Sequence, residues 1–285
     1  MTLQHPEWSY SSVVYEMNVR QLTPEGTLQA ATARLAFLHE IGIDIVWLMP
    51  VYPIGCEGRK GALGSYYSVR DYCAVNPELG TMDDFDRFIA TAHAMGMKVI
   101  LDWVANHTAR DARWVSERPA SWYERDAQGV PVVPWDWTDT AKLNYANPEV
   151  WEGQAEAMEF WLREHAVDGF RCDMAMLVPI EFWNEQRLRM VKPDLFLLAE
   201  AEEPNLFENG AFDACYAWQM GHLLEDVAQQ RVRVTALRDY LYADLGRYPE
   251  EAMRLTFTSN HDENSWSGSE FVRFGNAREA MTVFT

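Results

Sequence analysis

The sequence predicts an α/β protein built on a (β/α)8 barrel, and three observations carry that prediction. Short apolar runs alternate with longer segments of helical periodicity, which is typical of a parallel sheet covered by helices. Acidic residues stand at the ends of several of these runs, where the loops of a barrel open to solvent. No GxGxxG or GxxxxGKS/T turn follows any run, which disfavours the alternative of an open, nucleotide-binding sheet.

The apolar runs predict seven strands, over residues 13–19, 43–49, 97–103, 168–173, 195–200, 212–216 and 254–259. Helices are predicted between them, over residues 28–41, 82–95, 148–166, 180–190, 221–243 and 275–285. The helix over 148–166 has a clear start, because Asn147 is placed to cap it and Pro148 fits the first helical position. Seven such units predict a barrel that is incomplete at its C-terminal end, before an eighth strand.

One long segment interrupts this alternation. It contains "RDAQGVPVVPWDWTD", which is rich in turn residues and aromatics but has little periodicity. A small subdomain inserted after the third strand explains such a segment. We therefore expect a first barrel part over 1–107, an inserted subdomain over 108–147 and a second barrel part over 148–285.

The composition narrows the classes of partner. Hydrophobic residues make up 48% of the 285-residue chain, enough for a sizeable core. The formal net charge of -19 repels phosphate backbones and anionic lipid, so neither nucleic acid nor a membrane surface is an expected partner. The N-terminus lacks the features of a signal peptide, which predicts a cytoplasmic protein, although a secreted form after processing has the same pattern. No CxxC spacing is present, so we expect reduced cysteines at Cys56, Cys73, Cys172 and Cys215.

Four acids lie where predicted strands end: Asp102, Asp173, Glu200 and Asp262. A single acid in such a place is often a solvated loop residue or a helix cap. Four of them, with histidines and an arginine at the same end of successive strands, indicate a shared site instead.

The segment "DGFRCDMAMLVP" at 168–179 places Gly169, Arg171 and Asp173 on one face of a strand, with Phe170 and Cys172 on the other. A buried arginine is costly to desolvate unless it is paired. We therefore expect Arg171 to pair with Asp173, lowering the pKa of that carboxyl and keeping it ionised, as a nucleophile requires.

Two carboxyl groups of different character at one rim fit glycoside hydrolysis. One carboxylate attacks the anomeric carbon while a protonated partner donates to the leaving oxygen. Asp173 and Glu200, on neighbouring predicted strands, fit these two roles. The apolar approach "LFLLA" to Glu200 is expected to raise the pKa of that carboxyl and keep it protonated.

Several ordered segments resemble the signature motifs of the α-amylase family of glycoside hydrolases. "DWVANH" (102–107), "GFRCDMA" (169–175), "LLAEAE" (197–202) and "FTSNHDEN" (257–264) are similar to its first to fourth motifs. Further similarities are "GIDIVWLMPVYP" (42–53), "YYSVRDYCAVNPELGT" (66–81) and "LNYANPEV" (143–150). The resemblance covers nearly the whole chain. It implies a retaining enzyme that acts on α-linked glucans, starch or maltooligosaccharides.

The resemblance also implies residue roles. Asp173 is the expected nucleophile, Glu200 the acid/base, and Asp262 the third acid, which grips sugar hydroxyls. The implied substrate-binding residues are Tyr67, Asp102, His107, Arg171 and His261, with Arg171 orienting the nucleophile and Tyr67 stacking under the sugar. Three further aromatics are candidates for sugar subsites, although aromatic stripes are more often core packing: Trp103, Trp135 and Trp137.

Three departures from the family pattern qualify this picture. Met176 and Leu177 replace a Lys-His pair found in many endo-acting amylases, which weakens the case for long-starch hydrolysis. Lys142 stands where the family has an aspartate partner of the calcium ligand that Asn106 matches, so no calcium, metal or other cofactor is expected. The missing eighth strand predicts open barrel edges and self-association through them.

Other functions stay open on the sequence alone. Water and a sugar hydroxyl compete for the same glycosyl-enzyme, so transglycosylation is an alternative to hydrolysis. A catalytically silent carbohydrate-binding barrel is a second alternative, although it has no need of both Asp173 and Glu200. A metal-dependent hydrolase is a third, and no HxH or HExxH spacing supports it.

Overall fold

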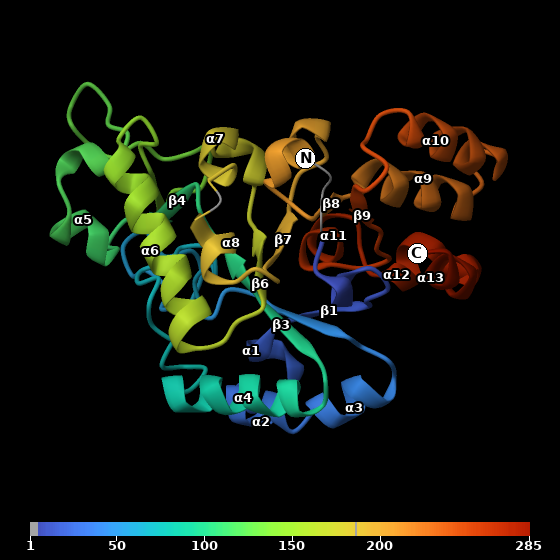
Figure 1. Cartoon of the computed structure of the whole chain (residues 1–285), viewed down its shortest axis with the longest axis horizontal. Coiled ribbons are helices and arrows are strands. Elements are labelled where there is room, and N and C mark those ends of the chain that lie inside the picture. Colours follow the sequence, from blue (N-terminus) through green and yellow to red (C-terminus); the bar gives the residue numbers. More distant parts are fainter. Residues whose placement is uncertain (1–4, 186) are drawn as a thin grey trace.

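The computed structural model describes residues 5–185 and 187–285, and the side chain of Arg187 is outside that description. Its main feature is a seven-stranded parallel sheet in the order β1-β2-β3-β6-β7-β8-β9 (Figure 1). The strands are β1 (Val14–Met17), β2 (Ile45–Leu48), β3 (Lys98–Trp103), β6 (Gly169–Cys172), β7 (Phe196–Ala199), β8 (Ala214–Tyr216) and β9 (Met253–Leu255). Each predicted strand is present, and the seven-unit, incomplete barrel is confirmed.

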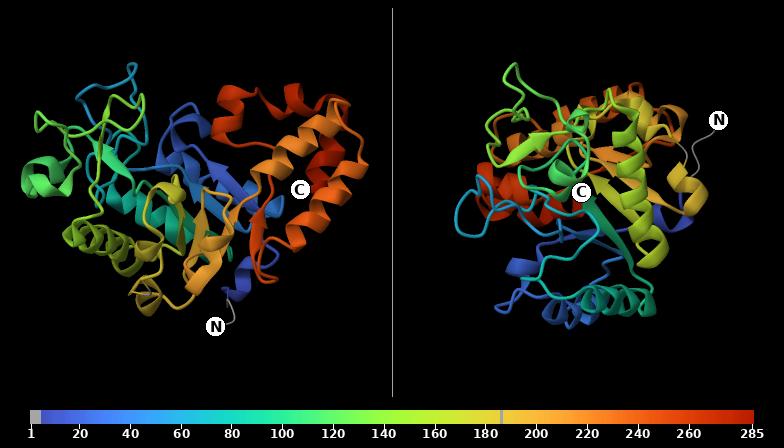
Figure 2. Two further views of the ribbon diagram at one scale, coloured as in Figure 1. Left: turned by 90° about the horizontal axis from the view of Figure 1, so that it is seen from above. Right: turned by 90° about the vertical axis from the view of Figure 1, so that its left-hand side faces the viewer.

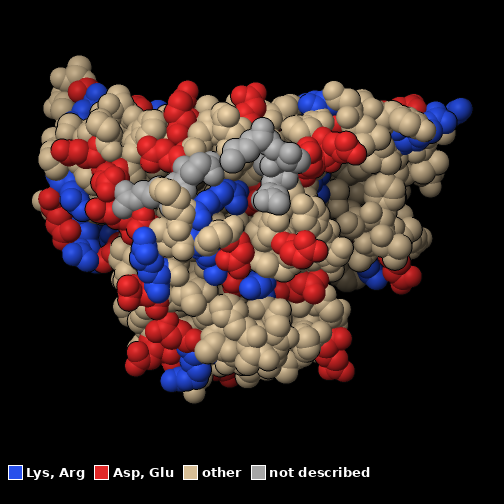
Figure 3. Space-filling view, in the orientation of Figure 1, with Lys and Arg blue, Asp and Glu red and all other residues tan. Residues whose placement is uncertain are grey.

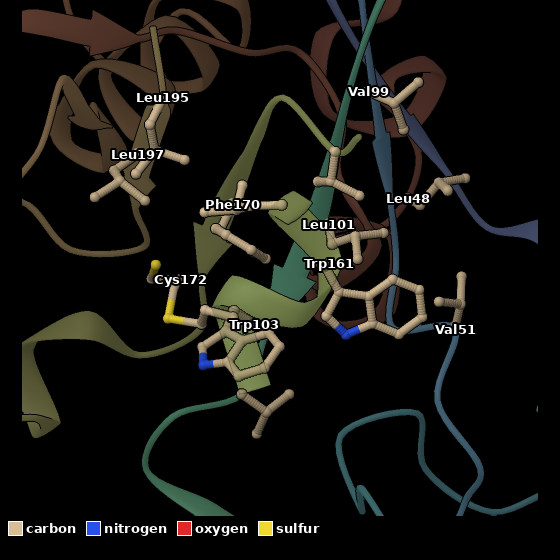
Figure 4. Packing of buried hydrophobic residues seen from close by; sticks show 14 of the residues in the cluster. Leu48, Val51, Val99, Leu101, Trp103, Trp161, Phe170, Cys172, Leu195 and Leu197 are labelled. Atoms are coloured by element: carbon tan, nitrogen blue, oxygen red, sulfur yellow. The ribbon is translucent and has the colours of Figure 1, made fainter. Parts of the chain in front are cut away.

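The two faces of the sheet follow the alternation of side chains. Inward residues form one apolar cluster: Ile45, Trp47, Ile100, Phe196, Leu198, Ala214 and Tyr216. Outward residues such as Leu101 and Phe170 pack with Trp161 of the helix α6 (Pro148–Glu164) in the largest cluster (Figure 4). Arg171 and Asp102 therefore point into the barrel, as strand parity predicts.

The helices cover the outer faces of the sheet. In Figure 1, α2 (Leu28–Thr32), α3 (Leu35–Glu40) and α4 (Met82–Ala94) lie together below the strands. The others are α1 (Val19–Leu22), α5 (Arg113–Glu117), α7 (Ile180–Trp183), α8 (Arg187–Val191), α9 (Trp218–Ala228), α10 (Thr235–Leu245), α11 (His261–Trp266), α12 (Glu270–Phe274) and α13 (Arg278–Phe284). Short 3-10 helices span Glu7–Ser9, Ala120–Trp122, Ala175–Leu177, Pro204–Gly210 and Gly275–Ala277.

Several predicted helices are divided in the structure. The segments 28–41, 180–190 and 221–243 each contain two helices with a break between them. Gln230 has φ +59°, and a left-handed residue at this point ends α9. The predicted start of α6 is confirmed, since the Asn147 side chain accepts from the N–H of Glu149 and Pro148 occupies the first turn.

A small antiparallel sheet lies between β3 and α6. It consists of β4 (His107–Ala109) and β5 (Thr140–Lys142), and it pairs His107 with Lys142. Loops and α5 fill the rest of the predicted inserted segment. Figure 2 shows this segment at one end of the molecule, with α9 and α10 at the other.

The sheet is open between its first and last strands. Among the described residues, β1 pairs only with β2, and β9 pairs only with β8. A groove of about 430 Å³ separates the two edges. Residues 256–259, predicted as strand, lie outside the sheet, and within the described part of the chain no strand flanks β9 on that side.

The distribution of charged side chains on the surface and the polarity of the helices agree with the expectations from the composition. Acidic and basic side chains are interspersed on the face shown in Figure 3, with no continuous basic surface there. Over residues 5–185 and 187–285, every helix is too short or too polar to cross a bilayer. The four cysteines are free, two exposed and two buried.

Candidate active site

A pocket of about 280 Å³ opens at the carboxyl ends of the strands. Six of the predicted site residues line it: Tyr67, His107, Asp173, Glu200, His261 and Asp262. The other two, Asp102 and Arg171, lie beneath it with side chains that are 0% exposed. The pocket therefore gathers residues from four strand ends and from the loop that follows β2.

Arg171 is the centre of this site. Its Nη1 lies 2.9 Å from Oδ1 of Asp102 and 3.1 Å from Oδ1 of Asp173. Its Nη2 lies 2.8 Å from Oε2 of Glu200. This contact is an ion pair without a well-aligned hydrogen bond, because the N–H bonds of Nη2 do not point at the carboxyl oxygen. The guanidinium also stands over the ring of Trp47, 4.9 Å from its centroid. One cation thus holds three carboxyl groups at the pocket floor.

The expected pKa of Asp173 was wrong in direction. Burial and the nearby carboxyl of Glu200 raise the pKa of Asp173 well above its ordinary value, and the opposing effect of Arg171 is smaller. Burial is the largest cause, and Arg171 offsets it only in part because its charge is shared among three carboxyl groups.

The expected direction for Glu200 is confirmed. Burial raises the pKa of the Glu200 carboxyl, against the lowering effect of Arg171 and of a backbone hydrogen bond. That bond comes from the N–H of Met174, 2.7 Å from Oε2. Met174 has φ +42°, an unusual value for a residue with a side chain, and this bend turns its N–H toward Glu200. No pattern in the sequence marks Met174 as a site residue.

His261 and Tyr67 form a hydrogen-bonded wall. The Tyr67 hydroxyl lies 2.9 Å from Nε2 of His261 and 3.1 Å from Oδ2 of Asp102, and the two rings stack with centroids 5.5 Å apart. Behind them, Glu16 of β1 contacts Nδ1 of His261 at 2.5 Å. The sequence analysis missed Glu16, although an acid on the inward face of an apolar strand is a signal that could have found it.

His107 has a different electrostatic state. Complete burial lowers the pKa of its imidazole to about 4, so the ring is neutral at neutral pH. The side-chain amide of Asn106 lies 3.2 Å from Nδ1. The ring of Trp137 lies 5.2 Å away, between centroids, and also lines the pocket.

The three candidate tryptophans lie in different environments. Trp103 is 0% exposed, packs in the core and donates from its indole N–H to Gln154, so of the two interpretations core packing is the one that holds. Trp137 lines the pocket, and the ring of Trp135, which is 64% exposed, lies 4.8 Å from it. Trp266, 85% exposed at the end of α11, also lines the pocket and was missed, as were Lys60, Ser65, Asp139 and Thr140.

The residues beside Asn106 do not fit calcium. Lys142 brings an ammonium group to the position where the family pattern has a carboxylate, and its Nζ lies 2.9 Å from Oε1 of Glu124. The side-chain amide nitrogen of Asn106 is directed to His107. Across the described part of the chain, no three His, Cys, Asp or Glu side chains are arranged as metal ligands.

Fold and site together define a class of protein. A parallel barrel sheet that carries buried carboxyl groups on neighbouring strand ends has the architecture of carbohydrate-active barrel proteins. Residues 10–137 and 121–268 match the family model described as "Alpha amylase, catalytic domain". The chain belongs to the α-amylase family.

Individual relatives support this membership. The α-amylase MalA of Haloarcula japonica is 32% identical over 277 residues, covering 92% of this chain and 40% of the relative. An α-1,4-glucan:maltose-1-phosphate maltosyltransferase of Rhodospirillum rubrum is 36% identical over 215 residues, covering 66% and 31%. The crystal structure of an α-amylase from Lactobacillus plantarum superposes with a TM-score of 0.82 at 34% identity, covering 88% of this chain and 63% of that chain. The chain therefore spans less than half the length of these curated relatives.

Proposed function

We propose that this chain carries the active site of a retaining enzyme that cleaves α-glucosidic linkages in α-glucans or maltooligosaccharides. The observation that carries the proposal is the shared contact of Asp173 and Glu200 with Arg171, at the floor of one pocket. Both carboxyl groups have raised pKa values, so a state with one proton between them is accessible. A double displacement requires that this proton be on Glu200 and that Asp173 be ionised.

The reaction runs in two steps. The ionised Asp173 attacks the anomeric carbon while protonated Glu200 gives its proton to the glycosidic oxygen, so the sugar becomes an ester of Asp173 and the leaving group departs as an alcohol. In the second step Glu200, now ionised, removes a proton from an incoming hydroxyl group, which attacks the same carbon and releases Asp173. The configuration at that carbon is retained.

The remaining residues hold the sugar and the acids. We assign Asp262 to the sugar hydroxyls as an acceptor, because its side chain is 47% exposed at the pocket wall. His107 presents a neutral imidazole to the pocket, and Tyr67 presents a ring face. Asp102 and Arg171 act from below by orienting Asp173. No step in this scheme needs a cofactor.

Transfer to a sugar hydroxyl is the second candidate function. It is favoured by the 36% identity to a relative named as a maltosyltransferase. The rim residues Trp137 and Trp266 offer exposed indole surface on which an acceptor sugar could stack. The two functions differ only in whether water or a sugar attacks the ester of Asp173.

The test is an assay with maltooligosaccharides on the wild-type protein and on Asp173→Asn and Glu200→Gln. We expect turnover by the wild type and, because general acid catalysis contributes roughly 10² to 10⁴-fold, a loss of at least that size in Glu200→Gln. The matched controls are Asp83→Asn and Glu40→Gln, both exposed, and they are expected to keep wild-type rates. Wild-type activity should be the same with a chelator present, since the described residues include no metal-ligand cluster.

Product analysis then separates the alternatives. A net gain of reducing ends supports hydrolysis, and disproportionation without such a gain supports transfer. Binding of maltooligosaccharides by the wild type without any turnover would overturn the catalytic proposal in favour of a silent carbohydrate-binding barrel.

A further inference from the structure

Glu16 is an acid on the inward face of β1, with a side chain that is 14% exposed. None of the proposed catalytic steps uses it. Its Oε1 lies 2.5 Å from Nδ1 of His261, and its Oε2 accepts the backbone N–H of the same residue at 3.1 Å. His261 is the first residue of α11, so this backbone contact satisfies one of the N–H groups that a helix start leaves free. Two contacts to one residue fix both the position and the ring orientation of His261.

The protons along this wall can be counted. Tyr67 has one hydroxyl hydrogen, and its hydroxyl lies 3.1 Å from Oδ2 of Asp102, a carboxylate that already pairs with Arg171. If Tyr67 donates to Asp102, its oxygen can only accept from Nε2 of His261, 2.9 Å away. Because Nδ1 faces the carboxylate of Glu16, both ring nitrogens then carry hydrogens, and His261 is an imidazolium.

The charged and titratable groups around this ring come from every neighbouring element. Glu16 of β1, Asp102 of β3 and Asp262 of α11 favour the cation, whereas Arg171 of β6 and burial oppose it. Tyr67 is a neutral neighbour, since burial raises the pKa of its phenol well above the ordinary value. Burial lowers the pKa of His261, but Glu16 outweighs that effect and the pKa is raised overall.

We propose that Glu16 is a positioning residue that holds His261 as an imidazolium, so that His261 presents a cation beside Asp262, the acid assigned to the hydroxyl groups of a neutral sugar. Nε2 of His261 lies 3.3 Å from Oδ2 of Asp262, close enough for direct attraction between the ring cation and this acid. The proposal rests on the proposed function for its catalytic consequence. The state of the His261 ring can be tested without catalysis.

The pocket also provides an internal contrast. Within the described part of the chain no carboxylate contacts the ring nitrogens of His107, the other histidine that lines it, and burial lowers the pKa of that ring to about 4, so it stays neutral. The two histidines therefore offer different hydrogen-bond patterns to a sugar, and the difference follows from Glu16.

The experiment is a ¹⁵N NMR titration of the histidine rings in the wild type, with His261→Gln to assign the signal, followed by Glu16→Gln. We expect both ring nitrogens of His261 to be protonated at neutral pH in the wild type. In Glu16→Gln its proton affinity is expected to fall about tenfold or more, which is about one pH unit. Glu57→Gln is the control, because Glu57 makes an exposed contact to Arg110 at 3.0 Å.

The kinetic arm uses kcat/KM against pH. Because the cationic form is required, activity falls as pH rises through the pKa of His261, and in Glu16→Gln that fall should move to lower pH. An unprotonated ring nitrogen in the wild type, or an unchanged titration in Glu16→Gln, would overturn the assignment of Glu16. The wild-type spectrum keeps the test valid if Glu16→Gln does not fold. A shifted titration with no turnover in any protein would instead overturn the proposed function and leave Glu16 in its role.

Discussion

The ionised form of Asp173 lowers the stability of the folded state. The folded protein holds the proton of this carboxyl more tightly than the unfolded chain does, because burial and Glu200 raise its pKa well above the ordinary value of 3.8. The unfolded state therefore binds fewer protons between these two pKa values, and the stability of the fold decreases as pH rises through that range. Above the folded-state pKa the loss is complete.

This cost predicts the effect of Asp173→Asn on stability. The variant keeps the side-chain shape but cannot ionise, so at neutral pH it is expected to melt a few degrees above the wild type, at roughly 2–4 °C per kcal/mol. The difference should shrink as pH falls through the folded-state pKa of Asp173 and disappear below 3.8, where the carboxyl is protonated in both states. Thermal melts at several pH values measure it, with Asp83→Asn as the exposed control. A variant less stable than the wild type at neutral pH would contradict this account.

At the scale of elements, the path of β6 beside β7 depends on one glycine. Gly169 points inward with Arg171, and a Cβ built there would lie 2.0 Å from the carbonyl oxygen of Phe196. That oxygen belongs to the backbone of the neighbouring strand, which cannot move aside without breaking the parallel pairing. The close approach sets the spacing of the two strands that carry Asp173 and Glu200.

Gly169→Ala is therefore expected to destabilise the protein by about 3 kcal/mol or more, through overpacking against backbone. Gly246→Ala is the matched control, since its φ of -89° suits alanine and the nearest atom to its Cβ, the Ala243 carbonyl oxygen, is 3.7 Å away. Urea denaturation of both variants checks the prediction. Equal midpoints for the two would show that β6 and β7 can separate without cost.

At the scale of the whole molecule, the seven-stranded sheet of the described residues is open. The free edges of β1 and β9 face each other across the groove, and unpaired edges are sites for pairing with another chain. Thr282 of α13 lines this groove, and its side chain is exposed to solvent. We expect association that increases with concentration and passes through this region.

A charge placed at the groove should weaken that association. Thr282→Glu adds a negative charge there and removes only the hydroxyl bond to the carbonyl of Arg278. Thr91→Glu is the control, since Thr91 makes the same bond to Arg87 on α4, far from the groove. Light scattering after size-exclusion chromatography is expected to show smaller species for Thr282→Glu than for the wild type and the control. Association equal in all three would mean that copies meet elsewhere.

The sequence by itself determined where the strands lie, which face of each strand its side chains occupy, and which acids stand at the strand ends. These features are local, because alternation of apolar and polar residues decides which way a strand side chain points. The contact of Arg171 with Asp173 followed from the same parity. The family motifs supplied the rest of the predicted site residues, all of which lie in or directly beneath one pocket.

Only the tertiary structure decided the direction of the pKa shift of Asp173 and the contact that holds His261. The pKa of Asp173 depends first on burial and on the nearby carboxyl of Glu200, and Trp103 joins the core because its side of β3 faces α6. The contact of Glu16 with His261 joins residues 245 positions apart, across the opening of the sheet. Charge sharing and burial are properties of groups assembled from distant parts of the chain, so no local pattern contains them.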